Sequence, residues 1–231
     1  MALRVLTWNL MHGRSLPPAG RYLEDEFVAA LARWEWDVAL LQEVPPWWPP
    51  ALAARLRADQ RLVLTSRNSL LPVRRAIAIR SPDLIKSNGG GANAILTRRG
   101  EILDHRTFRL SWFPERRWVH AIKLAGADGS DAPLWVANLH LTVRNPKAAM
   151  HEASNAGDAL LDWAAGAPAL LGGDFNVPSP SAPGFEPAGG HNVDHVLVSG
   201  LRATSDPEVL VRGLLSDHAP VAVDLARSSP A

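Results

Sequence analysis

The sequence predicts a layered α/β or α+β domain with β-sheet at its centre. Short apolar runs bounded by polar residues, glycine or proline recur along the chain, which is typical of buried strands. Fewer segments show helical spacing of apolar residues, and they lie between these runs. Because helices placed between strands cover the faces of a sheet, a layered arrangement is expected. The 231 residues fit one domain, which we take to span residues 1–231.

The individual elements follow from these patterns. Strands are predicted at residues 3–8, 38–42, 76–80, 94–97, 118–124, 134–140, 169–172, 193–198 and 220–225. Helices are predicted at residues 22–34, 49–59 and 146–165. Clusters of proline, glycine, serine and asparagine predict loops at residues 45–50, 88–91 and 178–190.

Composition excludes several classes of site. The chain has no cysteine, which removes disulfides, thiolate metal sites and cysteine nucleophiles. The first eight residues run directly into a strand pattern, so no signal peptide is expected. No apolar run approaches the roughly 20 residues that a membrane span needs. A cytoplasmic protein without a membrane span or an obligate protein partner is therefore the expectation.

Charge is distributed unevenly along the chain. Residues 1–125 hold 19 Lys and Arg against 11 Asp and Glu, whereas residues 126–231 hold 5 against 12. A basic half suits phosphate recognition and an acidic half suits metal binding. The alternative is that the arginines only cover solvent-facing strands.

Polar residues capable of chemistry cluster at the ends of the predicted strands. The clusters are TWNL at 7–10, LLQEV at 40–44, NLHL at 138–141, GGDFN at 172–176, NVDHV at 192–196 and SDHAP at 216–220. Taken singly, such residues are usually turn formers, helix caps or structural histidines. Taken together, they predict a shared polar site, and a hard cation would explain why oxygen donors gather there. Carboxylates and amides without thiolates favour Mg²⁺, Mn²⁺ or Ca²⁺ over structural zinc.

The order of these motifs resembles the endonuclease/exonuclease/phosphatase superfamily, which includes deoxyribonuclease I, apurinic/apyrimidinic endonucleases, sphingomyelinases and inositol polyphosphate phosphatases. The resemblance runs from Asn9 to Pro220, and GDFN with SDHAP is its most specific part. It implies a four-layer sandwich of two central, mostly antiparallel sheets flanked by helices, with the site at one end. It also implies one or two Mg²⁺ or Mn²⁺ ions as cofactor.

Three residues resemble the family's metal-binding positions. Glu43 resembles the principal ligand, Asn9 its supporting ligand and Asp217 a further carboxylate near the metal. One position departs from some family nucleases, which carry an acid where this chain has Met11. A ligand is then missing or comes from elsewhere, and the neighbouring His12 is one speculative substitute.

Five further residues resemble the catalytic group. Asp174 and Asn176 correspond to the pair that orients the attacking water, and His140 to the histidine that contacts phosphate. His218 corresponds to the general base and Asp194 to the carboxylate behind it. Histidine titrates near neutral pH, so the assignment of His218 is also reasonable chemically. Residues 74–77 offer no acid to pair with His140, which favours phosphate contact over proton transfer for that histidine.

Substrate-binding positions are less determined. Asn93 has either a functional or a turn role, and Arg98, Arg116 and Arg117 either clamp phosphate or lie on the surface. Core packing explains most of the nine tryptophans, although Trp47 and Trp48 could instead stack on unpaired bases or contact lipid.

Three hypotheses for function remain. The first is a metal-dependent nuclease or phosphodiesterase whose substrate is a phosphate ester such as DNA or RNA. The second is a phosphomonoesterase or a lipid or inositol-phosphate phosphodiesterase with the same machinery. The third is a binding protein of the same fold without turnover, suggested by Met11 and the missing partner acid.

Overall fold

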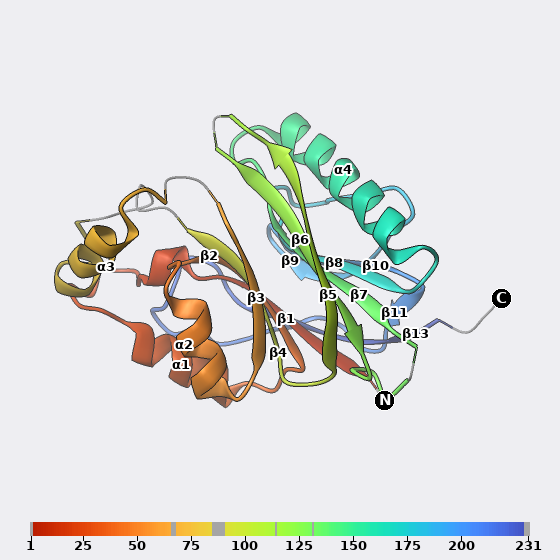
Figure 1. Ribbon diagram of the computed structural model, residues 1–231, viewed down its shortest axis with the longest axis horizontal. Helices are drawn as coiled ribbons and strands as arrows, with labels where there is room; N and C mark the ends of the chain where they lie inside the picture. Colours follow the sequence, from red (N-terminus) through yellow and green to blue (C-terminus); the bar gives the residue numbers. More distant parts are fainter. Residues whose placement is uncertain (1, 66–67, 85–90, 114, 131, 229–231) are drawn as a thin grey trace.

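The computed structural model describes residues 2–65, 68–84, 91–113, 115–130 and 132–228, and two β-sheets pack face to face in it (Figure 1). In the described part, the first sheet has the strand order β11-β13-β1-β2-β4-β3, and β12 also pairs with β13. Its strands are β1 (Leu3–Asn9), β2 (Val38–Val44), β3 (Asp59–Leu64), β4 (Ala92–Thr97), β11 (Leu201–Ala203), β12 (Glu208–Val209) and β13 (Val221–Arg227).

The second sheet has the order β5-β6-β7-β8-β10-β9. Its strands are β5 (Glu101–Ser111), β6 (Arg117–Ala125), β7 (Leu134–His140), β8 (Ala169–Asp174), β9 (Glu186–His191) and β10 (Asp194–Ser199). Each sheet contains one parallel pair, β1–β2 in the first and β7–β8 in the second, and the other pairs are antiparallel.

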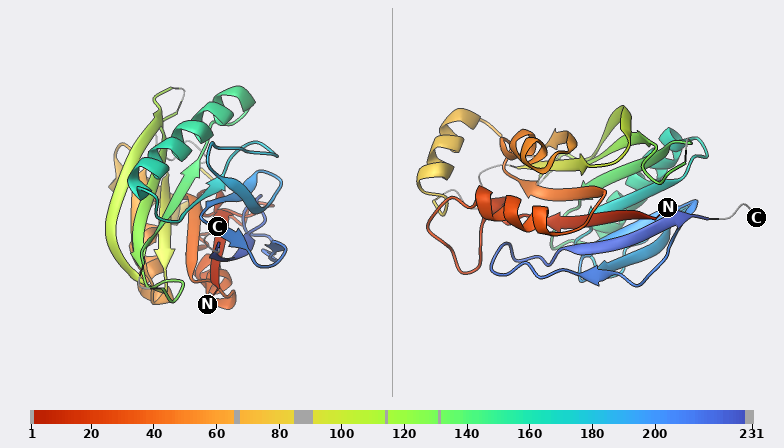
Figure 2. Two further views of the ribbon diagram at one scale, coloured as in Figure 1. Left: turned by 90° about the vertical axis from the view of Figure 1, so that its right-hand side faces the viewer. Right: turned by 90° about the horizontal axis from the view of Figure 1, so that it is seen from below.

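Helices cover the two outer faces of the sheet pair, on opposite sides of the molecule (Figure 2). Helices α1 (Glu24–Arg33) and α2 (Trp48–Leu56) pack on the first sheet through residues such as Phe27 and Leu52. Helix α4 (Pro146–Ala164) packs on the second sheet, where Leu160 joins Leu171 of β8. The predicted four-layer α+β sandwich is confirmed.

The layer between the sheets is filled by aliphatic side chains from both of them, including Val5 and Leu40 from the first and Val136 and Val196 from the second. Strands buried on both faces read as continuous apolar runs, which is why the central strands were predicted correctly. Gly172 allows the sheets to approach closely here, because an added Cβ would lie 2.5 Å from Leu40 Cδ1.

The predicted strand at residues 76–80 is wrong, because these residues form the end of helix α3 (Leu71–Arg80). The alternation of alanine and isoleucine suggested a strand. The segment projects from the body of the molecule, beyond both sheets (Figure 1), and none of the described strands pairs with it. Pro72 lies in its first turn, where proline is compatible with a helix.

Two predicted loops contain regular structure. Helix α2 begins at Trp48, within the loop predicted at residues 45–50, with prolines in its first turn. Strand β9 occupies the end of the loop predicted at residues 178–190. Its glycines mark a close approach of neighbouring groups, since a Cβ at Gly190 would lie 2.1 Å from His195 Nδ1. Residues 88–90 of the third predicted loop lie outside the described residues.

The tryptophans mostly belong to the core, as expected. Trp8 lies in ring contact with Phe27 and Trp34, and Trp48 is 1% exposed. Trp47 and Trp48 both donate hydrogen bonds to the Tyr22 hydroxyl, so the indoles are turned toward the protein. Within the described residues, no helix combines the length and the apolar character needed to cross a membrane.

A buried histidine of β6, paired with a half-buried one on β5, should make stability depend on pH. His120 of β6 is fully buried, and its Nδ1 lies 3.3 Å from His105 Nε2 on β5. Burial, and secondarily the charge of His105, lowers the pKa of His120 well below its usual 6.5. The folded state therefore keeps His120 neutral, whereas the unfolded chain takes up a proton below about pH 6.5. The stabilisation is complete above that pH and is lost progressively as the pH falls from there toward the lowered pKa of the folded state.

We predict that His120→Leu reduces the loss of unfolding free energy between pH 7 and pH 5 by about 2 kcal/mol. Urea unfolding of both proteins at the two pH values measures the difference. The same replacement at the exposed His151 of α4 should leave the pH dependence unchanged. Parallel pH profiles for His120→Leu and the unaltered protein would refute this assignment.

Candidate active site

Strands from both sheets bring polar side chains to one end of the sandwich. Asn9 ends β1, and Glu43 lies near the end of the adjacent parallel strand β2. In the second sheet, Asp174 pairs with His140 on one side and with Asp194 on the other. A pocket of about 290 Å³ opens here, and the predicted residues that line it are Asn9, Glu43, Asn93, Arg116, Arg117, His140, Asp174, Asn176, Asp217 and His218.

A carboxylate and an imidazole form a short polar contact at the edge of the pocket. His218 Nδ1 lies 2.7 Å from Asp194 Oδ2, and His218 Nε2 lies 3.8 Å from Asp174 Oδ2. Burial alone would lower the pKa of His218, but the hydrogen bond to Asp194 and the nearby carboxylates raise it to about 9. This ring therefore holds a proton firmly when only protein groups surround it.

The backbone of His218 is fixed by two side chains. Trp8 Nε1 donates to the His218 carbonyl at 3.0 Å, and the His218 amide donates to Ser216 Oγ at 3.1 Å. The Ser216 hydroxyl in turn donates to the Asn9 carbonyl at 2.6 Å. The core indole of the Trp-Asn motif thus positions the imidazole, a role that sequence reasoning did not assign to Trp8.

Asp174 is 1% exposed and lies at the centre of the group. Its Oδ2 accepts from Asn9 Nδ2 at 2.9 Å, and its Oδ1 accepts from the Asn176 amide at 3.0 Å. Burial, followed by the charge of Asp194, raises its pKa to about 7. Gly173 is required in front of it, because its φ is +139° and an added Cβ would lie 2.1 Å from the Leu139 carbonyl oxygen.

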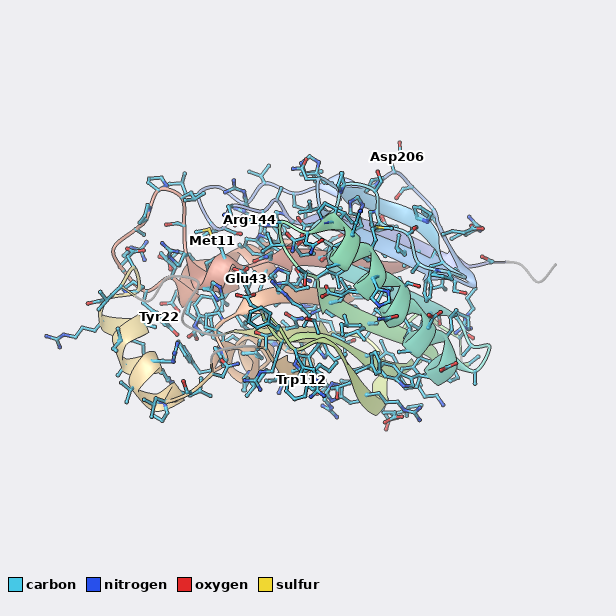
Figure 3. The ribbon with its side chains drawn as sticks, turned by 90° about the horizontal axis from the view of Figure 1, so that it is seen from above. Met11, Tyr22, Glu43, Trp112, Arg144 and Asp206 are labelled. Atoms are coloured by element: carbon cyan, nitrogen blue, oxygen red, sulfur yellow. The ribbon has the colours of Figure 1, made fainter. Side chains whose placement is uncertain are left out.

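Glu43 reaches the pocket through an irregularity in β2. The register between β2 and β4 shifts between Leu41 and Val44, and Glu43 has a left-handed φ of +50°. Its carboxylate is 3.1 Å from His12 Nε2 and 4.0 Å from His140 Nε2. In Figure 3, Glu43 lies at the same end of the molecule as Met11 of the neighbouring η1 turn (Met11–Gly13).

Two buried amides hold this irregular segment against the second sheet. Asn138 Nδ2 donates to the carbonyls of Leu41 and Ala94, at 3.0 and 2.9 Å. Gln42 Nε2 donates to Asn138 Oδ1 at 2.8 Å. Sequence reasoning missed this clamp, and the available signal was an amide in each of two strands whose other residues are almost all apolar.

His140, Arg116 and Arg117 form another wall of the pocket. Burial, followed by the charges of Arg117, His218 and His12, lowers the pKa of His140 well below its usual value, so its ring is neutral. Arg117 is 6% exposed and pairs with Glu115 at 2.8 Å. A neutral imidazole and a buried guanidinium are both suited to contact phosphate oxygens.

The structure does not place Arg98 among the residues that line the pocket, and its side chain packs elsewhere. Its guanidinium lies 3.7 Å from the centre of the Trp36 ring and donates to the carbonyls of Trp34 and Leu31. It packs at the end of α1, where burial lowers its pKa. Nothing in the residues around Arg98 indicated that an indole would cover it.

The donor chemistry of the pocket fits a divalent cation. Carboxylate and amide oxygens from Asn9, Glu43 and Asp217 line it. Asn93 is 1% exposed, and neither polar atom of its side chain has a hydrogen-bond partner among the described residues, which points to a ligand. Ligand atoms of Asp174, Asp194 and His218 also lie within 4.8 Å of one another.

Comparison with known proteins gives a family and a fold. The chain matches the model of the Endonuclease/Exonuclease/phosphatase family over residues 6–218. Among curated protein sequences, no significant match to the chain was found.

Three solved structures show the likeness of fold. The endonuclease/exonuclease/phosphatase from Bacteroides vulgatus has a TM-score of 0.74 at 18% identity, with 99% of this chain and 100% of that chain covered. The mannosyl-6-phosphatase of Bacteroides thetaiotaomicron has a TM-score of 0.71 at 18% identity, covering 97% and 99%. The human Nocturnin catalytic domain, which carries a bound sulfate anion, has a TM-score of 0.72 at 19% identity, covering 98% and 94%.

Proposed function

Because the chain belongs to the Endonuclease/Exonuclease/phosphatase family, we propose that it is a divalent-metal-dependent hydrolase of phosphodiesters, with nucleic acid as the leading substrate class. The observation that carries this proposal is the Asp194–His218 pair, which faces Asp174 in a pocket also lined by Glu43. These groups supply a proton acceptor and a place for a cation within one small cavity, as hydrolysis of a phosphate ester requires.

The cation would be held by Glu43, Asn9 and Asp217, as one or two Mg²⁺ or Mn²⁺ ions. When bound, it neutralises charge on the phosphate oxygens and lowers the pKa of nearby acids toward the working pH. Asn9 is oriented for this task by Asp174, to which its amide nitrogen donates. The Asn9 Oδ1 accepts from the Met11 amide and retains a second lone pair for a ligand.

The protein groups would then position and deprotonate water. A water within reach of both His218 Nε2 and Asp174 Oδ2 can lose its proton to the imidazole as it attacks phosphorus, and the leaving oxygen departs in line on the opposite side. Asp194 fixes the tautomer of His218 and stabilises its cation. Asn176 supports Asp174 through its backbone amide.

The wall of the pocket that His140 and the arginines form would bind the substrate. His140, Asn93 and Arg117 line the pocket with neutral or cationic polar groups, and Arg116 is an exposed guanidinium at its edge. These groups are suited to the non-bridging phosphate oxygens.

Phosphomonoester hydrolysis is the second candidate. The pocket holds only about 290 Å³, and the ion pair between Glu115 and Arg117 offers both an acceptor for hydroxyl groups and a cation for a terminal phosphate. A similar fold in a mannosyl-6-phosphatase is consistent with a small phosphorylated substrate. Inositol phosphates and phospholipid head groups belong to the same alternative. A catalytically silent binding protein would turn over none of these substrates.

Activity on a substrate panel separates these possibilities. The panel contains supercoiled plasmid, single-stranded RNA, sugar and inositol phosphates and sphingomyelin, each with Mg²⁺ or Mn²⁺. We expect nucleic acid to be cleaved only with metal present, and Glu43→Gln to raise the metal concentration at half-maximal rate by about tenfold or more. Glu101→Gln, at an exposed glutamate of β5, is the matched control.

The outcomes are distinct. Intact nucleic acid together with hydrolysis of a small ester would replace the first candidate by the second. An unaltered metal titration for Glu43→Gln would remove that carboxylate from the metal site.

A further inference from the structure

The η1 turn brings an imidazole to the pocket that the proposed mechanism does not use. Met11 and His12 have left-handed φ angles of +46° and +55°, directly after the end of β1. Such angles are uncommon for residues other than glycine, and for methionine they cost free energy. The turn is held by Asn9 Oδ1, which accepts from the Met11 amide, and it places the His12 ring against Glu43.

The contact between His12 and Glu43 has the separation of two neighbouring metal ligands. His12 Nε2 lies 3.1 Å from Glu43 Oε2. Adjacent ligands of an octahedral ion lie about 3.0 Å apart when each is bound at about 2.1 Å. Both side chains are accessible from the pocket but mostly buried, with exposed fractions of 15% and 24%. A cation on the pocket side can therefore contact both atoms without a large rearrangement.

The surrounding groups are consistent with this role. Among the described residues, His12 Nδ1 is buried and has no hydrogen-bond partner, which leaves it available to a bound water or ligand. Asn93, on the same pocket, has the same property. The side chain of Met11 offers no carboxylate, whereas His12 directly follows it.

We propose that His12 is a nitrogen ligand of the divalent cation bound at Glu43, and that it makes the site selective for transition-series ions such as Mn²⁺ over Mg²⁺. The inference rests on the proposed metal-dependent function, and specifies the donor set of that site. Mg²⁺ strongly prefers oxygen ligands, whereas imidazole nitrogen binds transition-series ions well. A site with an imidazole ligand carries less negative charge than one with a carboxylate in its place, which weakens Mg²⁺ binding further.

Metal binding to the 231-residue chain tests this without substrate. Electron paramagnetic resonance with Mn²⁺ should detect hyperfine coupling from an imidazole nitrogen, and the coupling should disappear in His12→Ala. Titration calorimetry should show Mn²⁺ bound at least about tenfold more weakly by His12→Ala, with a smaller change for Mg²⁺. Circular dichroism verifies that each variant is folded.

Two controls identify the source of the nitrogen. His140→Ala removes the other imidazole near Glu43, and His151→Ala removes an exposed one on α4. Both variants should keep the coupling. Coupling that persists in His12→Ala, or that is missing from the unaltered protein, would overturn the proposal, as would an unchanged ratio of Mn²⁺ to Mg²⁺ affinity.

Glu43→Gln separates this inference from the proposed function. If Glu43→Gln weakens Mn²⁺ binding and His12→Ala does not, only the ligand role of His12 fails. If neither variant changes Mn²⁺ binding, both the ligand role and the metal site of the proposed function fail.

Discussion

Replacing His218 by alanine is expected to lower kcat for phosphate-ester hydrolysis by about 10³-fold, with a small effect on KM. The imidazole is the one histidine whose Nδ1 is held by a buried carboxylate while its Nε2 faces Asp174, as far as the described residues show. Removing it deletes the proton acceptor but leaves the cation-binding side of the pocket and the phosphate-contacting wall in place. Steady-state kinetics on the best substrate of the panel measure the loss, with His151→Ala as the control.

Asp194→Asn should have an effect of similar size through the same imidazole. The uncharged amide of asparagine does not replace the carboxylate that accepts from His218 Nδ1. His218 therefore loses the partner that fixes its tautomer. Because the two residues act as one unit, the double variant should be no slower than His218→Ala alone. Full activity in His218→Ala, or independent and multiplicative losses, would contradict the pairing.

The fold was predictable where strands are buried on both faces. Strands β2 and β7 are mostly apolar and almost wholly buried, so their sequences alone identify them. Strands β3 and β5 were missed because they lie at sheet edges and alternate irregularly between exposed and half-buried residues. Helix α3 was mistaken for a strand because its apolar residues are not buried, and periodicity carries information only when one face is covered.

The positions of the site residues could be predicted where they depend only on the ends of strands. Asp174 and Asp194 face one another because their strands are paired: Asp174 ends the apolar run of β8, and Asp194 begins that of β10. His12 was left as a speculation because its approach to Glu43 depends on two consecutive left-handed residues. The contact of Arg98 with Trp36 was not predicted because the two residues are far apart in the sequence.

Asn138 belongs to a motif that the sequence analysis recognised, but its role was not predicted. It belongs to the Asn-x-His motif, yet it does not line the pocket. Its amide instead crosses between the sheets to carbonyls that the irregular register of β2 and β4 leaves free for it. The sequence cannot show which carbonyls a shifted register will expose.

We predict that Asn138→Leu lowers the free energy of unfolding by about 3 kcal/mol, because the buried carbonyls of Leu41 and Ala94 lose their donor and Gln42 loses an acceptor. Urea unfolding measures this change. Asn155→Leu, at a partly exposed asparagine of α4 whose side chain hydrogen-bonds, within the described part of the chain, only to the exposed His151, is the matched control and should change stability little.

The same variant should also raise the metal concentration needed for half-maximal activity under conditions where it remains folded. The carbonyls that Asn138 binds flank the segment on which Glu43 adopts its left-handed conformation, so a loosened clamp lets that carboxylate leave its position. A destabilised protein with an unaltered metal titration would mean that the amide clamp joins the sheets without positioning Glu43. A shifted metal titration would instead show that the contact of Asn138 between the sheets contributes to metal affinity. The Asn138 amide does not line the pocket, so it can act on Glu43 only through the backbone of β2.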